Sequence, residues 1–83
     1  MLLNEYFDVQ GNYVSEYDSS NIKKSYYDLG NQTLMITFNS GTTYSYEPVQ
    51  PYMVQQFKLA ESQGKYFIAN IKNDPRIKVT KLT

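Results

Sequence analysis

The segment at residues 59–73, LAESQGKYFIANIKN, gathers side chains that could bind an anion and a nucleobase. A helix that begins just after Gly64 would point free backbone N–H groups outward near Lys65, and helix starts bind phosphate in this way. Tyr66 could stack on a base. Asn70, four residues later and therefore on the same side of a helix, could hydrogen-bond a base edge or a ribose. These residue types at this spacing predict a contact surface for a nucleotide or a nucleic acid.

A second interpretation assigns the aromatic residues to the core. Tyr66 and Phe67 could anchor the helix, with Asn70 bracing a loop, because aromatic residues at helical spacing are more often core than stacking platform. The same choice applies to Tyr44 and Tyr46, which would be core on a covered sheet face and stacking platforms on an open one. The face that they share with the apolar residues favours the core. The candidate ligand-binding residues are Lys65, Tyr66, Asn70, Lys72, Tyr46 and Arg76.

The side chains on which most enzymes depend are missing. The chain has no histidine and no cysteine, which removes the usual general base, a thiolate nucleophile, disulfides and zinc–sulfur sites. The serines therefore have no histidine to deprotonate them. Glu16 and Asp18 supply fewer ligands than a calcium loop does. We expect a protein that is not an enzyme and that holds no metal and no cofactor.

Charge is distributed unevenly along the chain, although the net charge is zero. Residues 1–22 carry four acidic residues and no base, whereas residues 58–83 carry six bases and two acids. The basic half could attract phosphate groups. Two other interpretations stay open. The two ends could pair within one fold, or the acidic end of one copy could dock on the basic end of another and form a homo-oligomer.

Nine tyrosines and four phenylalanines are the main means of building a core in a chain of 83 residues, which we expect to form one domain over residues 1–83. Tyrosine hydroxyls must reach water or a partner, so many of these residues should lie at the core boundary or at an interface. No segment approaches the roughly 20 apolar residues that span a bilayer, and the opening MLLNEYFDVQ lacks the features of a signal peptide. We expect a cytoplasmic protein without a membrane partner.

The elements that would position these residues begin with an antiparallel meander. Residues 33–38 alternate apolar and polar side chains, and residues 42–46 return after a tight-turn signal at residues 39–41. Residues 22–27, which precede these two, are expected to form another strand of the meander.

Each end of the chain adds strand signals. Residues 5–17 read as a small hairpin around Gln10-Gly11-Asn12, within an N-terminal hairpin extension of residues 1–18. Residues 76–82 alternate basic and apolar side chains, as an edge strand does, within the basic C-terminal segment 74–83.

Helix signals follow the meander. Pro51 suits a first helical turn, and helical spacing of apolar residues continues to Ala60. Gly64 is expected to take the left-handed conformation after this helix. A second short helix is expected over residues 65–72, stopped by Asp74-Pro75. The predicted fold is α+β: an antiparallel β-meander with one longer and one short helix packed on one face.

Two short segments, SGTTYSY at residues 40–46 and AESQGKYF at residues 60–67, carry a family resemblance. Residues 19–73 resemble the KTSC domain family, named from a segment at the C-terminus of some lysyl-tRNA synthetases and also found as free-standing proteins of bacteria and their phages. The resemblance implies RNA or nucleotide binding in a bacterial cell. Ser25 stands where the family usually has an apolar residue, which predicts a less deeply packed strand. Lys72 stands where arginine is common, which keeps the charge but loses bidentate phosphate geometry.

The sequence thus predicts a non-catalytic binding module for nucleic acid or a nucleotide, acting through a basic and aromatic surface in its second half. The alternative is a phage-encoded protein-interaction or counter-defence protein that blocks a host protein or sequesters a signalling nucleotide.

Overall fold

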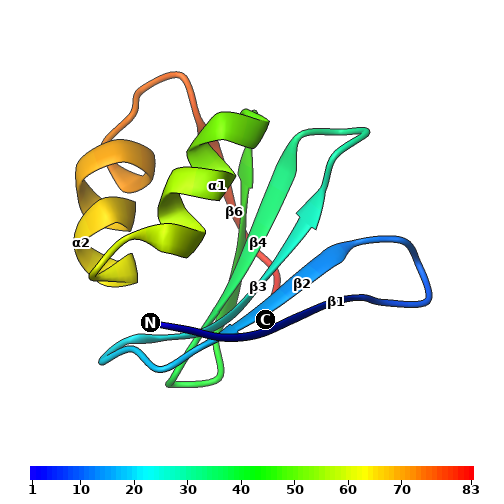
Figure 1. The fold of residues 1–83 in the computed structure, drawn as a ribbon. Helices are drawn as coiled ribbons and strands as arrows, with labels where there is room; N and C mark the ends of the chain where they lie inside the picture. Colours follow the sequence, from blue (N-terminus) through cyan, green and yellow to red (C-terminus); the bar gives the residue numbers. More distant parts are fainter.

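The computed structural model describes residues 1–83, and it contains one antiparallel sheet with helices on one of its faces (Figure 1). Six strands lie in the sheet in the order in which they occur in the chain. They are β1 (Leu2–Phe7), β2 (Tyr13–Tyr17), β3 (Ile22–Asp28), β4 (Thr33–Phe38), β5 (Thr43–Glu47) and β6 (Lys78–Lys81). The predicted α+β meander is confirmed, and the N-terminal hairpin and the basic tail form the outer strands of the same sheet.

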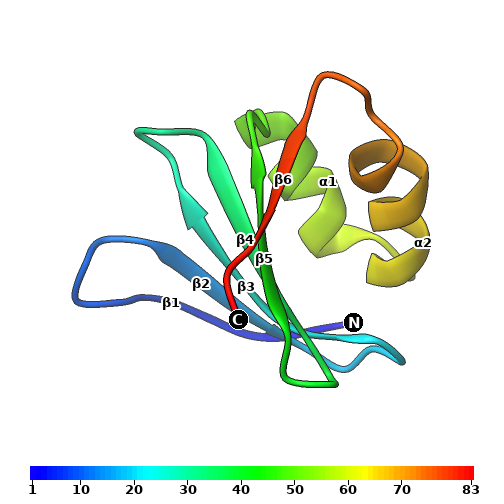
Figure 2. The ribbon, with the colours of Figure 1, turned by 180° about the vertical axis from the view of Figure 1, so that it is seen from behind.

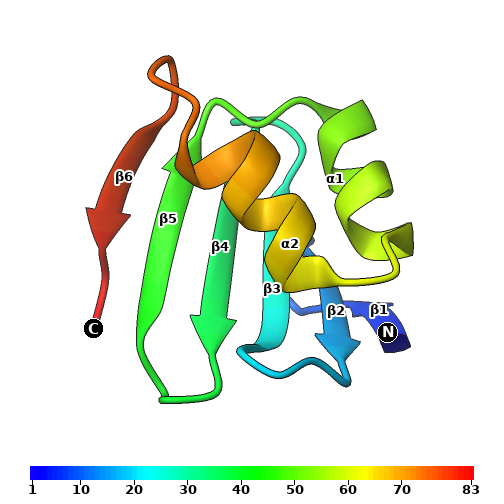
Figure 3. The same cartoon turned by 90° about the vertical axis from the view of Figure 1, so that its left-hand side faces the viewer.

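Helical structure occupies the chain between β5 and β6, as α1 (Pro51–Leu59), α2 (Gln63–Phe67) and a π-helical segment, η1 (Ile68–Lys72). These helices stay on one side of the sheet when the molecule is seen from opposite directions (Figure 1 and Figure 2). α2 crosses in front of β4, and α1 lies toward β2 (Figure 3). No helix is both long and apolar enough to cross a membrane.

Gly64 does not have the role predicted for it. α1 ends at Leu59, and Gly64 is a helical residue in α2 rather than a left-handed residue after a helix. The reason for glycine at this position is a close approach of two segments: a Cβ atom at Gly64 would lie 2.6 Å from Oδ1 of Asn21. A larger residue here would have to displace the Asn21 side chain, so this contact, and not the end of a helix, accounts for the small residue.

The core lies between the sheet and the helices. Strand alternation turns the apolar residues of β4 and β5 toward α1 and α2, because successive side chains of a strand point to opposite faces. Tyr46 belongs to this core, whereas Tyr44 is partly buried against it. The core residues are Tyr17, Ile22, Tyr27, Leu34, Ile36, Tyr46, Val49, Met53, Val54, Phe57, Phe67, Ile71 and Ile77.

The acidic and basic ends of the chain lie at opposite edges of the sheet, because β1 and β6 are its two outer strands (Figure 3). The two ends therefore do not pair with each other along strands. One ion pair joins the acidic and basic segments, between Glu5 of β1 and Lys58 of α1 at 2.8 Å. The sequence left open whether the acidic and basic ends pair within one fold. In the structure, this ion pair is the extent of such pairing.

Candidate functional site

An aromatic groove lies between the sheet and the helical segment formed by α2 and η1. Its volume is about 460 Å³. β4, β5 and β6 contribute from one side, and α2 and η1 from the other. The lining residues are Asn21, Phe38, Tyr44, Tyr46, Phe67, Ile68, Lys72 and Val79, and we call this site the aromatic groove.

Four rings pack edge to face at the bottom of the aromatic groove. Phe67 lies 5.2 Å from Tyr46 and 5.7 Å from Phe38, measured between ring centroids. Tyr44 and Tyr46, two positions apart in β5 and therefore on the same face, have centroids 6.5 Å apart and an angle of 30° between their planes. Tyr46 is only 4% exposed, whereas Tyr44 is partly exposed and presents its ring to the groove.

Cationic side chains border this aromatic surface. Lys72 lines the groove and is exposed. Lys81 of β6 stands directly opposite Tyr44 in the strand pairing, so both side chains lie on the helix-covered face. Lys65 precedes Ile68 by three residues and Lys72 by seven, which places all three on one stripe of the helical segment. No carboxylate lines the groove.

A polar hollow of about 440 Å³ adjoins the aromatic groove and shares three of its residues, Asn21, Phe38 and Tyr44. Ser20, Asn39, Ser40 and Thr42 complete its lining. Side-chain amides and hydroxyls therefore stand beside the accessible ring of Tyr44. Nδ2 of Asn39 donates to the carbonyl of Ser19 at 2.9 Å, and Oδ1 of Asn21 accepts from Oγ of Ser19 at 3.2 Å. The other amide atom of each asparagine can still bond a base edge or a ribose.

The six residues predicted to bind a ligand do not form one site. Tyr46 and Lys72 line the aromatic groove. Tyr66, Asn70 and Arg76 line a different hollow beside α1 and the turn before β6. Lys65 is exposed and lines neither.

The side chains of Tyr66, Asn70 and Arg76 are already hydrogen-bonded within the chain. The Tyr66 hydroxyl donates to Oε1 of Gln56 at 2.7 Å, and Nδ2 of Asn70 donates to the carbonyl of Tyr66 at 3.2 Å. The Arg76 guanidinium makes two hydrogen bonds to Asp74, at 2.9 and 3.1 Å. Asn70 thus braces the helical segment, and Asp74 neutralises Arg76.

The free N–H group expected near Lys65 is also occupied. The backbone N–H of Lys65 donates to Oγ of Ser62 at 3.2 Å, and that of Tyr66 donates to the carbonyl of Ser62 at 3.1 Å. Ser62 therefore caps α2 with its own side chain. The two N–H groups nearest Lys65 are thus bonded within the chain, and the structure gives the predicted phosphate site no free donor at these two positions.

Deprotonation of Tyr46 is expected to destabilise the fold at high pH. Burial, with a smaller effect of Tyr44, raises the pKa of the Tyr46 hydroxyl to about 12. The unfolded chain loses this proton near its ordinary pKa of about 10, so stability is complete below that pH and falls as the pH rises toward 12. Between about pH 9 and about pH 11.5, this one group should cost on the order of 1–2 kcal/mol.

Urea unfolding at the two pH values measures this loss, with Tyr46→Phe as the control because it removes only the hydroxyl. Other groups also titrate in this range, so the readout is the difference between the two proteins. An equal loss of stability in both would contradict the assignment to Tyr46.

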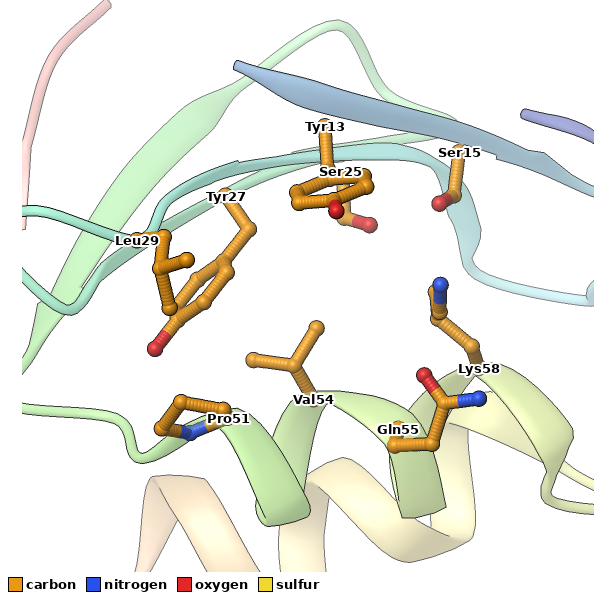
Figure 4. Close-up of a pocket in the computed structure, with 9 residues that line it drawn as sticks. All are labelled: Tyr13, Ser15, Ser25, Tyr27, Leu29, Pro51, Val54, Gln55 and Lys58. Atoms are coloured by element: carbon orange, nitrogen blue, oxygen red, sulfur yellow. The ribbon is translucent and has the colours of Figure 1, made fainter. Parts of the chain in front are cut away.

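A third hollow lies between α1 and the strands β2 and β3 (Figure 4). Its nine lining residues include Ser15, Ser25 and Lys58, none of which was predicted to bind a ligand. Ser25 was expected to mark a less deeply packed strand, yet it is buried; its small side chain instead leaves a cavity beside it. The signal in the sequence is a serine at core-facing positions between tyrosines, as in Tyr13-Val14-Ser15-Glu16-Tyr17.

The model of the KTSC domain family matches residues 18–74. The chain belongs to the KTSC domain family. The match contains seven of the eight residues that line the aromatic groove, all but Val79. The resemblance expected from residues 19–73 is confirmed.

Two relatives extend this assignment. The crystal structure of a KTSC domain protein from Yersinia pestis has a TM-score of 0.77 and 31% sequence identity to this chain, and the likeness covers 84% of this chain and 96% of that one. A protein of Stutzerimonas stutzeri (strain A1501), described as uncharacterized, is 41% identical over 49 residues, which are 59% of this chain and 69% of the relative. The fold of the KTSC domain protein thus accounts for most of this chain.

Proposed function

We propose that this KTSC domain is a non-catalytic module that binds single-stranded nucleic acid or a nucleotide in the aromatic groove. One base would stack on Tyr44, and the adjoining phosphates would lie near Lys72 and Lys81. The observation that carries the proposal is the partly exposed Tyr44 ring, set among cations in a groove that no carboxylate lines. Stacking aromatics combined with basic side chains are the usual means of binding single strands.

The polar hollow beside Tyr44 supports the same function. Asn39 and Ser40 are exposed, and with Asn21 they offer amide and hydroxyl groups along the path that a strand would take from the groove. Polar groups beside a stacking ring are suited to the ribose and to the edge of a base. A synthetase-associated family is also consistent with an RNA ligand.

Fluorescence anisotropy of short labelled RNA and single-stranded DNA should detect this binding. The affinity should fall between about 50 mM and about 200 mM salt, because phosphate contacts release counterions. Tyr44→Leu keeps an apolar side chain beside Phe38 and removes the stacking ring, and it should weaken binding about 5- to 100-fold. Lys81→Ala should weaken binding and reduce the salt dependence.

Lys78→Ala is the matched control, because Lys78 lies in the same strand but on the opposite face of the sheet from Lys81. It should leave the affinity close to that of the wild type. Absence of salt-sensitive binding to any of the probes, or equal effects of Lys78→Ala and Lys81→Ala, would refute the proposal.

Protein binding is a second candidate function, favoured by the hairpin of β1 and β2. This hairpin lies at one edge of the sheet and carries several large exposed apolar side chains. They are Leu3, Tyr6, Phe7, Val9 and Tyr13. An edge strand with exposed apolar residues can accept a strand of a partner protein or of a second copy of this chain. The hairpin lies outside the family match, so this function would be specific to chains with this extension.

A further inference from the structure

The hollow between α1, β2 and β3 is separate from the aromatic groove, and the two have no lining residue in common. Its volume is about 210 Å³. That is smaller than the about 300–1,000 Å³ of pockets for drug-sized ligands, so the space suits one ring system. Its apolar walls come from Tyr13, Tyr27, Leu29, Pro51 and Val54 (Figure 4). We call it the serine pocket.

Two buried serines form the polar floor of the serine pocket, opposite α1 (Figure 4). Ser15 and Ser25 line it and are only 1% and 2% exposed. The Tyr17 hydroxyl and Oγ of Ser25 share a hydrogen bond of 2.8 Å. Burial raises the pKa of Tyr17, and its contacts with the two serines offset part of this effect, so the Tyr17 hydroxyl stays protonated at neutral pH.

Hydrogen-bonding capacity at this floor exceeds what the chain itself uses. Each hydroxyl can donate one hydrogen bond and accept two. The bond between Tyr17 and Ser25 uses only part of this capacity. The Ser15 hydroxyl contacts that of Tyr17, and it points into the space toward α1 (Figure 4). No buried polar side-chain atom lacks a hydrogen-bond partner, so a ligand at Ser15 would use the remaining capacity of this hydroxyl.

Lys58 of α1 faces Ser15 across the serine pocket (Figure 4). Its side chain is only 11% exposed and is held by Nζ pairing with Oε2 of Glu5 at 2.8 Å. Nζ also lies 5.7 Å from the centre of the Tyr13 ring. The carboxylate of Glu5 balances the charge of Lys58, while an ammonium group has three donor protons. The polar end of the pocket therefore offers donors without a net charge.

We propose that the serine pocket binds a neutral planar heterocycle that carries a carbonyl or a ring nitrogen. The ring lies against Tyr13, Tyr27 and Val54, and its acceptor atom takes hydrogen bonds from Ser15 and Lys58. The apolar walls provide the contact area for the ring, and the balanced pair of Lys58 and Glu5 favours a neutral acceptor over an anion. This site is independent of the binding of nucleic acid in the aromatic groove.

Titration of the isotope-labelled chain with uracil and with nicotinamide tests the site, and amide chemical shifts are the readout. Benzene is the control, because it is a ring without a hydrogen-bond acceptor. Uracil or nicotinamide should shift the signals of Ser15, Ser25 and Val54, and benzene should shift them at higher concentrations only. Ser15→Ala should weaken this binding about 2- to 10-fold, the effect of losing one hydrogen bond. Its melting temperature should stay close to that of the wild type, because the hydrogen bond between Tyr17 and Ser25 is kept.

Ser45→Ala is the matched serine control, since Ser45 lies in β5 on the face of the sheet away from the helices. It should bind the rings as the wild type does. Tyr44→Leu separates this proposal from the preceding one: it should weaken RNA binding and leave the serine pocket unaffected. Shifts confined to the aromatic groove, no shifts at all, or equal affinities of Ser15→Ala and Ser45→Ala would overturn the assignment.

Discussion

Replacing Phe57 with alanine is expected to lower the free energy of unfolding by about 3–5 kcal/mol. Phe57 lies in the last turn of α1 and is 0% exposed. Its ring joins the strands to both helices, with centroid distances of 5.4 Å to Tyr17 of β2 and 6.3 Å to Tyr66 of α2. Removing the ring loses its burial and leaves a cavity that the surrounding rings cannot fill completely. Urea unfolding followed by circular dichroism measures the loss.

Phe7→Ala is the control for this prediction, because the same ring is 62% exposed in β1. Phe7 contacts Tyr13 at 4.4 Å between centroids, so a loss of about 0.5–1.5 kcal/mol is expected from this one aromatic pair. Comparable losses for the two variants would show that Phe57 is not the centre of the core.

The second large effect is expected at Gln63, which closes the end of α1. Its Nε2 lies 3.5, 3.3 and 3.0 Å from the carbonyl oxygens of Phe57, Lys58 and Ala60. Its Oε1 accepts from the amino group of Met1 at 2.5 Å. The last carbonyls of a helix have no partner within the helix, and here one fully buried side chain supplies it.

Gln63→Leu keeps a side chain of similar length and removes every one of these hydrogen bonds. We expect a loss of about 1–3 kcal/mol, because buried carbonyls are left without donors. Thermal unfolding measures the change. Gln50→Leu provides the comparison, since Gln50 is exposed and its side chain makes no capping hydrogen bond to α1. A melting temperature for Gln63→Leu as high as that of Gln50→Leu would exclude the proposed closing of α1.

Local patterns account for the strands and for the approximate place of the helices. Alternation in residues 33–38 predicted β4 with its observed bounds, because one face of this strand is buried and the other is not. Pro51 marked the first residue of α1 since few other positions of a helix accept proline. Gly64 was misread because a glycine can serve a helix end or a close contact, and the sequence around it does not distinguish them.

Residue spacing alone did not determine which residues form the candidate site. Tyr66 and Asn70 were correctly placed one turn apart, but the side of the helical segment on which they lie depends on how it packs. Phe67 and Ile71 are buried against the sheet, which turns Tyr66 and Asn70 toward α1 and the turn before β6. The same rotation turns Ile68 and Lys72 toward Tyr46, although 26 positions separate Lys72 from it in the chain. The direction in which a helix faces is set by its buried residues and their partners.

The sequence by itself determined the α+β class, the order of strands and helices, the family, and the uneven distribution of charge, since each depends on residue types and local spacing. Only the tertiary structure decided which side chains share a hollow. It divided five of the six predicted residues between two hollows and left Lys65 in neither, placed Tyr44 and Lys81 at the aromatic groove, and formed the serine pocket beneath α1. The physical reason is that strand pairing and helix packing join residues far apart in the chain, and these contacts leave no periodic signal in the sequence.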